Sequence, residues 1–278
     1  MILDSELEVT LSELTAEIIV EYQDRHARVI LNRPSARNAY STTMITELIR
    51  VLDELELDPA VRVVVITGAG TAFSAGGDLK LMQSRQGMFA GGPVELRARY
   101  MQEIQRVPRR LARFSKPVIA AINGAAIGAG LDLSLMCDLR IASAKAIFGS
   151  TFVKVGLIPG DGGAYYLARA VGLATALDLC LTGRVIDANE AKTLGLVSRV
   201  VTPDELLTHA SKVAEEIASN APLAVQLTKA AVYQSLTLTP DGALQLAASF
   251  QGIAQTSQDH LEGVDAILER RSPSFKGE

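Results

Sequence analysis

Hydrophobic and polar positions alternate along the chain in two periods, which predict strands and helices in turn up to residue 202. Two β-branched runs, residues 61–67 and 117–122, stop at glycine, as buried strands of a parallel sheet do. Shorter strands are predicted at 18–22, 28–32, 139–142, 146–148 and 197–201. Apolar residues spaced three to four apart predict helices at 41–57, 94–113, 164–171, 174–182 and 187–194, and one that begins near Ala129.

Beyond Pro203 the pattern changes to helices alone, with breaks at Pro222 and Pro240. Because mixed strands and helices give way to helices there, we place a boundary between a core of residues 1–202 and a helical region of residues 203–278. Residues 1–15 form a polar extension. Residues 84–93, rich in glycine, predict a mobile loop.

Composition narrows the classes of function. The 278 residues are 48% hydrophobic and 21% charged, which is typical of a globular protein with ample core. A net charge of −4, with charges of both signs mixed along the chain, argues against nucleic acid as a partner. Cys137 and Cys180 lie in apolar stretches, which favours buried free thiols. With no signal peptide and no run long enough to span a membrane, the expected location is the cytoplasm.

Two glycine-rich turns, each after a strand and each with a carboxylate, carry the candidate chemistry. The first spans residues 68–78 and ends at Asp78, and the second spans 124–132 and ends at Asp132. Small residues let a backbone approach another group closely. Two such turns can therefore aim two backbone N–H groups at one oxygen atom, which is what stabilising an oxyanion requires.

Several other catalytic motifs are absent. Phe73 interrupts a dinucleotide-binding glycine pattern, and Ala72 stands where a nucleophile elbow needs glycine. The three histidines are far apart in sequence, and no metal-ligand spacing occurs, so we expect no metal site. What remains is acid–base work by carboxylates beside an oxyanion site.

Seven segments then occur in the order typical of one family. They are LNRPSARNA (31–39), AFSAGGDL (72–79), KPVIAAING (116–124), CDLRIA (137–142), GLIPG (156–160), LTGR (181–184) and AKTLGLV (191–197). On these the chain resembles the enoyl-CoA hydratase/isomerase family, the crotonase superfamily. The resemblance implies an α/β fold, a crotonase-like spiral of ββα units with a C-terminal helical trimerisation region.

The resemblance also implies a substrate and an assembly. Members of the family bind an acyl-CoA thioester and stabilise its enolate with two backbone N–H groups, which fall here at Gly77 and Ala129. No cofactor is implied, because CoA is part of the substrate. The implied partners are the thioester and further copies of the chain, as a homotrimer or a dimer of trimers, with neither nucleic acid nor a membrane.

The implied substrate-binding residues cluster in the motifs. They are Ala36, Ala39, Ala75, Gly76, Asp78, Leu79, Lys80, Gly128, Phe152 and Arg270. Among these, Asp78 is expected to brace its turn. Lys80 and Arg37 are candidates for contact with the phosphates of CoA, as is Arg270 from a neighbouring subunit.

The implied catalytic residues depart from the family pattern. Hydratases of the family use two glutamates; Asp132 stands at the first position and Phe152, which cannot transfer a proton, at the second. Asp161, in another glycine turn, is the candidate substitute. Each aspartate also has a structural interpretation: Asp132 would interact with a helix dipole, and Asp161 would cap the helix at 164.

Three functions follow from this pattern. The first is an enoyl-CoA hydratase/isomerase that acts through a stabilised enolate, with Asp132 and Asp161 as the catalytic pair. The second is a double-bond isomerase with Asp132 as main base, since isomerisation needs one base only. The third, which Phe152 favours, is an acyl-CoA-binding protein without catalysis.

Overall fold

The computed structural model describes residues 16–278, so the predicted extension at residues 1–15 lies outside the described residues. A six-stranded sheet forms its centre, in the order β1-β2-β3-β5-β7-β10. All neighbours are parallel except β1 and β2. Its strands are β1 (Ile18–Tyr22), β2 (His26–Leu31), β3 (Val63–Gly68), β5 (Val118–Ile122), β7 (Leu139–Ser143) and β10 (Arg199–Val201).

A smaller sheet of four short strands lies beside the first. Its order is β4 (Ala72–Ser74), β6 (Ala125–Ile127), β8 (Ile147–Gly149) and β9 (Val185–Asp187). The chain passes from a strand of the large sheet to a strand of the small one and then to a helix, three times over: β3–β4, β5–β6 and β7–β8. These repeats are the predicted ββα units, and the α/β fold class is confirmed. The sequence pattern missed β4 and β6, which are hidden inside the glycine-rich turns.

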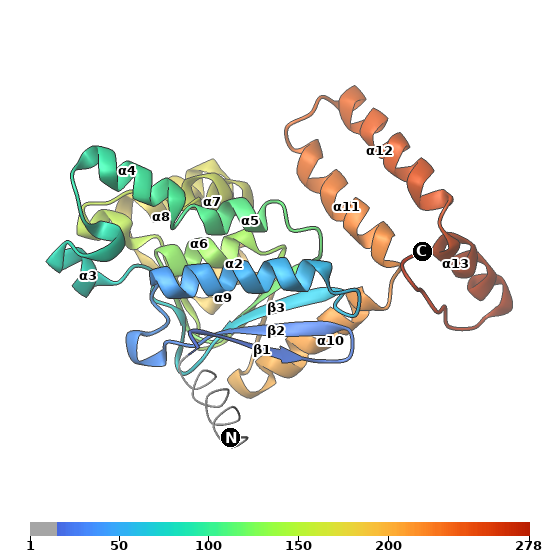
Figure 1. Ribbon diagram of the computed structural model, residues 1–278, viewed down its shortest axis with the longest axis horizontal. Helices are drawn as coiled ribbons and strands as arrows, with labels where there is room; N and C mark the ends of the chain where they lie inside the picture. Colours follow the sequence, from blue (N-terminus) through green and yellow to red (C-terminus); the bar gives the residue numbers. More distant parts are fainter. Residues whose placement is uncertain (1–15) are drawn as a thin grey trace, which may run out of the picture.

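Helices cover both faces of the large sheet (Figure 1). On one face, α2 (Thr42–Leu57) begins at Ser41, whose hydroxyl accepts a hydrogen bond from the Met44 N–H as predicted for a cap. Seven further α-helices follow α2 in the chain before α10. They are α3 (Leu79–Ser84), α4 (Pro93–Gln102), α5 (Arg106–Leu111), α6 (Ala129–Met136), α7 (Gly163–Val171), α8 (Leu173–Thr182) and α9 (Ala188–Thr193).

The last four helices divide between the core and an arm. Although α10 (Leu206–Ala218) lies beyond the boundary predicted at residue 202, its apolar side is buried with Val63, Val65 and Ile119 on the second face of the sheet. In contrast, α11 (Pro222–Ser235), α12 (Pro240–Gln255) and α13 (Gln258–Glu269) extend away from the core as an arm (Figure 1). The part that stands apart is therefore residues 222–278.

Two predicted segments differ from the structure. The helix expected over 94–113 is divided into α4 and α5, because Glu103 at the end of α4 leaves helical geometry (φ −114°, ψ −84°). The expected loop at 84–93 contains a 3-10 turn, Gly87–Phe89, whose Met88 is buried in the core. Within residues 16–278, the helices are all too short or too polar to cross a bilayer.

Candidate active site

The two predicted oxyanion donors lie at the ends of neighbouring parallel strands. Gly77 follows β4 and Ala129 follows β6, and these strands pair side by side in the small sheet. Among the backbone hydrogen bonds of the described residues, neither N–H has an acceptor. Both residues line one closed cavity. The fold thus places two unused donors at the ends of neighbouring strands, and their role as an oxyanion site stays a prediction.

Glycine is what allows the two turns to touch. A Cβ atom on Gly76 would lie 2.5 Å from the Ile127 carbonyl oxygen and 2.9 Å from the Ala129 nitrogen. A Cβ on Gly130 would lie 2.1 Å from the Ser74 carbonyl oxygen. Gly76 also has a positive φ of 85°, which side chains rarely adopt. The close approach of the backbones, and with it the position of both N–H groups, depends on these two residues.

Alanine is compatible with the role of position 129 as a backbone donor, because the unusual backbone dihedral angles occur at its neighbour Gly128. Gly128 has a positive φ (φ 55°, ψ −123°), which side chains rarely adopt, and Ala129 is the first residue of α6. The first N–H groups of a helix have no partner within the helix and lie at its positive dipole end. The Ala129 N–H is therefore a donor suited to a developing negative charge.

Asp132 and Asp161 form a buried pair. Asp132 lies in the first turns of α6 and accepts a hydrogen bond from the Gly163 N–H (3.0 Å). Its carboxyl group is within hydrogen-bonding reach of that of Asp161, and each aspartate is only 1% exposed. The capping role considered for Asp161 is wrong, since Gly162 is the residue at the start of α7 and no side chain caps it. One oxygen of each carboxyl has no partner among the described residues.

Burial changes the protonation of this pair. Loss of solvation raises the pKa of Asp132 well above its ordinary value, and the neighbouring charge of Asp161 raises it further. Burial also raises the pKa of Asp161, although hydrogen bonds from Asp132 and from its own backbone N–H oppose the shift. Ionising both of two adjacent carboxyl groups costs free energy, because their negative charges repel each other. We interpret them as sharing one proton, with Asp132 as the donor and Asp161 as the ionised acceptor.

A closed cavity of about 20 Å³ joins the donors to this pair. It is lined by Tyr40, Gly77, Met82, Met88, Phe89, Tyr100, Ile104, Ala129, Phe152, Leu157 and Asp161. Asp161 is the member of the pair that lines it. Phe152, at the position of the second glutamate, forms part of the apolar wall, and its ring is 3.8 Å from where a Cβ on Gly128 would lie.

An open groove of about 640 Å³ continues outward from the cavity. Tyr100 and Leu157 line both spaces, so they separate the inner cavity from the groove. Leu96, Met101 and Ile158 make much of the groove apolar. This space can take the acyl chain of a thioester whose carbonyl reaches the two donors.

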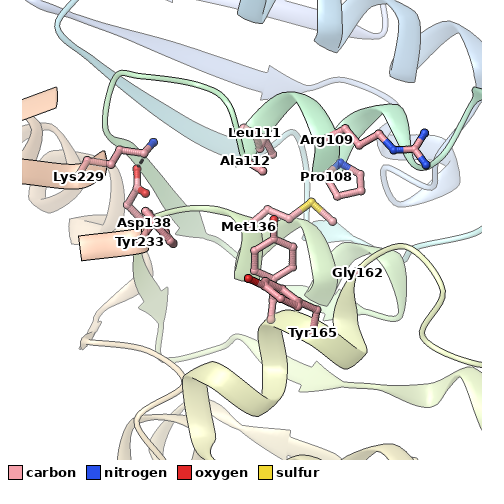
Figure 2. Close-up of a pocket in the computed structure, with 11 residues that line it drawn as sticks. Pro108, Arg109, Leu111, Ala112, Met136, Asp138, Gly162, Tyr165, Lys229 and Tyr233 are labelled. Atoms are coloured by element: carbon pink, nitrogen blue, oxygen red, sulfur yellow. Dashed lines mark ion pairs between the residues drawn. The ribbon is translucent and has the colours of Figure 1, made fainter. Parts of the chain in front are cut away.

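A second hollow of about 410 Å³ lies between α5, α7 and α11, and neither carboxyl group of the pair lines it (Figure 2). Lys229 of α11 reaches across to Asp138 (2.8 Å) and donates to the Lys116 carbonyl oxygen (2.8 Å). These contacts hold the base of the arm against the core. In the part of the chain that is described, no cluster of His, Cys, Asp and Glu is suited to a metal ion.

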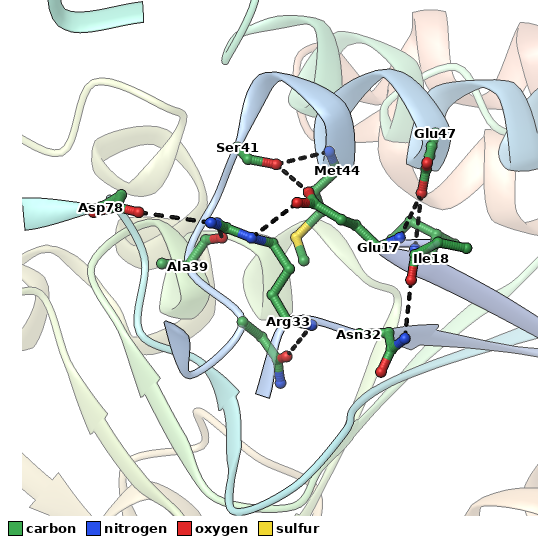
Figure 3. A network of polar contacts seen from close by, with 11 residues as sticks. Glu17, Ile18, Asn32, Arg33, Ala39, Ser41, Met44, Glu47 and Asp78 are labelled. Atoms are coloured by element: carbon green, nitrogen blue, oxygen red, sulfur yellow. Dashed lines mark hydrogen bonds and ion pairs between the residues drawn. The ribbon is translucent and has the colours of Figure 1, made fainter. Parts of the chain in front are cut away.

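The turn at residues 33–41 is fixed by a polar network (Figure 3). The Arg33 guanidinium donates to the Ala39 carbonyl oxygen (2.5 Å) and forms ion pairs with Glu17 (3.0 Å) and Asp78 (3.7 Å). Asp78 in turn accepts from the N–H groups of Lys80 (3.1 Å) and Leu81 at the start of α3. Asp78 thus sits where a bracing residue would.

The remaining predicted residues lie at different distances from the chemistry. Ala39 and Gly76 are buried at the turns, and Ala36, Ala75 and Leu79 flank them. Lys80 and Arg37 are exposed near the first turn. Arg270 ends α13, in the arm and apart from the cavity of its own chain (Figure 1). Cys137 is buried as expected, while Cys180 is only partly so.

Sequence reasoning missed the two tyrosines that line the cavity, Tyr40 and Tyr100. Burial and the charges of Asp161 and Asp132 raise the pKa of both phenols, so both stay protonated. Neither residue lies in a glycine turn or in a position that the family motifs assign. The one feature of the sequence that could have pointed to Tyr40 is its place directly after Asn38-Ala39, the end of the first motif.

Comparisons with known proteins agree with this geometry. The family model described as enoyl-CoA hydratase/isomerase matches residues 21–278. The chain is 42% identical to a "Probable enoyl-CoA hydratase" of Rhizobium meliloti, over 93% of this chain and 97% of that protein. It is 39% identical to the crotonyl-CoA hydratase of Syntrophomonas wolfei, over 93% and 97%. The crystal structure of an enoyl-CoA hydratase from Bacillus anthracis superposes with a TM-score of 0.88 at 38% identity, covering 94% of this chain and all of that one.

Proposed function

The chain belongs to the enoyl-CoA hydratase/isomerase family and is an enzyme of that type, and we propose that it acts on an acyl-CoA thioester through an enolate held by Gly77 and Ala129. One observation carries the proposal. Two unused backbone donors and Asp161, one member of a buried carboxyl pair, line the same cavity. The relatives named for hydration of enoyl-CoA thioesters support the substrate class.

The backbone donors supply the electrostatic part of catalysis. With the thioester oxygen between Gly77 and Ala129, both N–H groups face the charge that develops when an enolate forms. Donors fixed in advance cost no reorganisation, and one such donor is typically worth about 3–4 kcal/mol of barrier. The N-terminus of α6 adds its dipole to the same point.

The carboxyl pair supplies the proton transfers. In hydration, the ionised Asp161 takes a proton from water as the water oxygen bonds to C3 and the C2–C3 π electrons move onto the thioester as an enolate. The protonated carboxyl then delivers that proton to C2, which regenerates the carboxylate. In isomerisation of a 3-enoyl thioester, the same group removes a proton from C2 and returns it to C4. Asp132, behind it, stabilises the charge by its hydrogen bond.

A specific observation favours isomerisation as the second candidate. Phe152 gives the cavity an apolar wall where hydratases of the family have a glutamate. One base is enough to move a double bond. Whether Asp132 or Asp161 is the main base then depends on which reaches the substrate, and Asp161 is the one that lines the cavity.

Mass spectrometry in D₂O distinguishes these reactions. We would incubate the protein with trans-2-enoyl-CoA and with 3-enoyl-CoA thioesters and follow mass and bond position. Addition of water supports the hydratase, and bond migration or deuterium uptake without added water supports the isomerase. If neither substrate changes while CoA thioesters still bind, the proposed activity is wrong.

Assembly and location complete the proposal. The arm carries exposed apolar residues on α12 and α13, including Leu244, Ile253, Ile267 and Leu268, which contact between copies would bury. We therefore expect a homotrimer or a dimer of trimers, in which Arg270 of one copy reaches the CoA of another. Lys80 and Arg37 are the candidates for CoA phosphates within the chain. The free thiols suit the cytoplasm, and the chemistry requires no cofactor.

A further inference from the structure

Tyr40 presents a polar group to the cavity that the proposed mechanism does not use. The residue is 2% exposed, and its hydroxyl has no hydrogen-bond partner among the described residues. It lines the cavity together with Gly77, Ala129 and Asp161. A buried unpaired polar group typically costs about 1–3 kcal/mol, so it calls for an explanation other than stability.

The backbone fixes Tyr40 to the oxyanion turn. Its N–H donates to the Gly76 carbonyl oxygen (2.7 Å), and Tyr40 and Gly77 form a parallel bridge. On one side Arg33 binds the Ala39 carbonyl oxygen, and on the other Ser41 begins α2 (Figure 3). The phenol therefore has little freedom to turn away, and the segment that sets the first donor also sets this hydroxyl.

The size and polarity of the cavity are suited to binding one small group that carries an oxygen atom. A volume of about 20 Å³ exceeds what a single water molecule requires, and a buried water needs two to four polar partners. Tyr40 and Asp161 both line the cavity, and each has a buried oxygen atom without a hydrogen-bond partner among the described residues, so both can serve as such partners.

We propose that Tyr40 and Asp161 together bind one water molecule in this cavity, with the Tyr40 hydroxyl donating to the water oxygen and the water donating to the Asp161 carboxylate. Tyr40 is then a positioning residue, since it acts on Asp161 through the water. In hydration this water is suitably placed as the reacting one; in isomerisation it holds the carboxylate in its ionised form. The inference rests on the proposed function for its effect on turnover.

The charges around the site are consistent with this role. The charges of Asp161 and Asp132 act on Tyr40 and Tyr100 in the cavity wall. The pair itself responds to Cys180 from α8 and to the N–H groups of Gly163 and Asp161. Cys137 also faces Tyr40. Because Tyr40 stays protonated, it acts as a hydrogen-bond donor and not as an acid.

Tyr40→Phe tests the proposal, since it removes the hydroxyl and keeps the ring. We expect kcat to fall about 10- to 100-fold, the range for loss of a hydrogen bond that serves a charged group, with KM little changed. The low-pH limb of the rate profile should move to higher pH, because the carboxylate loses support. The unfolding midpoint in urea should stay the same or rise, because no intramolecular bond is lost.

Tyr166→Phe is the matched control. Tyr166 is a half-buried tyrosine of α7, and its pKa responds to Tyr165, Arg169 and Asp138 and not to the carboxyl pair. It should keep both the rate and the pH profile. Normal kcat and an unmoved profile in Tyr40→Phe would overturn the proposal, as would a loss of rate that only follows a loss of stability.

A crystal structure of the unmodified protein gives a test that requires neither a variant nor turnover. An ordered oxygen within hydrogen-bonding distance of both the Tyr40 Oη and an Asp161 oxygen is expected. A direct bond between these two side chains, or no ordered oxygen at this point, would overturn the inference. Inactivity of the unmodified protein on both enoyl-CoA substrates would count against the proposed function alone.

Discussion

The cavity has two halves that are built from different parts of the chain. Its oxyanion half consists of backbone: the N–H groups of Gly77 and Ala129, placed by the contact between two turns. Its other half consists of side chains: Asp161 and Tyr40 line the cavity, and Asp132 lies behind Asp161. A backbone donor survives replacement of its side chain, whereas a carboxyl group does not.

This difference explains where the sequence departs from its family. Ala129 stands where relatives commonly have glycine, and its donor is still present and unused. In the side-chain half, Phe152 stands where relatives have a glutamate, and that proton-transfer group is lost. In the proposed mechanism, polarisation of a thioester would therefore persist under substitutions that change the path of the proton.

Asp161→Asn should have the largest effect, because it removes the carboxylate of the side-chain half. We expect kcat to fall about 10³-fold, within the range for loss of a general base, while binding of a saturated acyl-CoA is kept. Asp132→Asn should cost less, since Asp132 lies behind Asp161. Steady-state kinetics and calorimetry check both, with exposed Asp204→Asn as the control. A rate in Asp161→Asn equal to the original would remove Asp161 from the mechanism.

Gly76→Ala should break the backbone half without touching any catalytic side chain. The added Cβ would meet the Ile127 carbonyl oxygen and the Ala129 nitrogen in a residue with φ 85°, so the two donors must separate. We expect a loss of about 10²- to 10³-fold in kcat, the range for a lost oxyanion donor. Gly252→Ala, in α12 with open space around it, is the matched control and should keep its rate.

The protonation of the pair should also appear in the stability of the protein. Its native carboxyls have raised pKa values, so between the ordinary value of about 4 and the native value the folded state binds more protons than the unfolded state. Their contribution is full below the ordinary value and is lost as the pH rises through the native one.

Asp161→Asn should reduce that dependence, because it removes one titrating carboxyl group and the charge that further raises the pKa of Asp132. Relative to the unmodified protein, its free energy of unfolding should therefore increase as the pH rises from 5 to 8. Urea unfolding at three pH values measures the difference, in which the contributions of other groups cancel. A constant difference over this range would mean that the pair does not retain a proton in the folded state.

Ala129→Gly should have the smallest effect. The N–H group stays, and glycine in a helix is destabilising by about 0.5–1 kcal/mol relative to alanine. We expect kcat within about threefold of the original, a change too small for loss of an oxyanion donor, and a slightly lower unfolding midpoint. A loss as large as that of Gly76→Ala would show that the Ala129 side chain itself matters.

The backbone half could be predicted from the sequence, and much of the side-chain half could not. Gly76, Gly128 and Gly130 leave a mark in the sequence because only glycine fits such turns. Tyr40 leaves little mark beyond its place directly after the first motif, since an unpaired hydroxyl depends on what packs around it after folding. The role of Asp161 could not be predicted from the sequence either. Whether this residue caps a helix or faces a cavity depends on where α7 begins.

The same limit applied to the elements. Strands β3 and β5 can be predicted from their runs of β-branched residues. Strands β4 and β6 have only three residues each and lie within glycine-rich turns, so they give no such pattern. The apolar residues of α10 have the spacing of any amphipathic helix. The sequence therefore predicts the helix but not that it packs on the sheet, which depends on tertiary contacts.

Gly163 has a consequence for recognising other enzymes with this chemistry. A Cβ there would lie 2.2–2.5 Å from the carboxyl atoms of Asp132, although the residue begins a regular helix. A larger residue at position 163 would therefore displace the Asp132 carboxyl group from the place that it has in this pair. We expect an aspartate at both 132 and 161 with glycine at 163 to mark proteins that share this arrangement, and a larger residue at 163 to mark a pair with a different geometry.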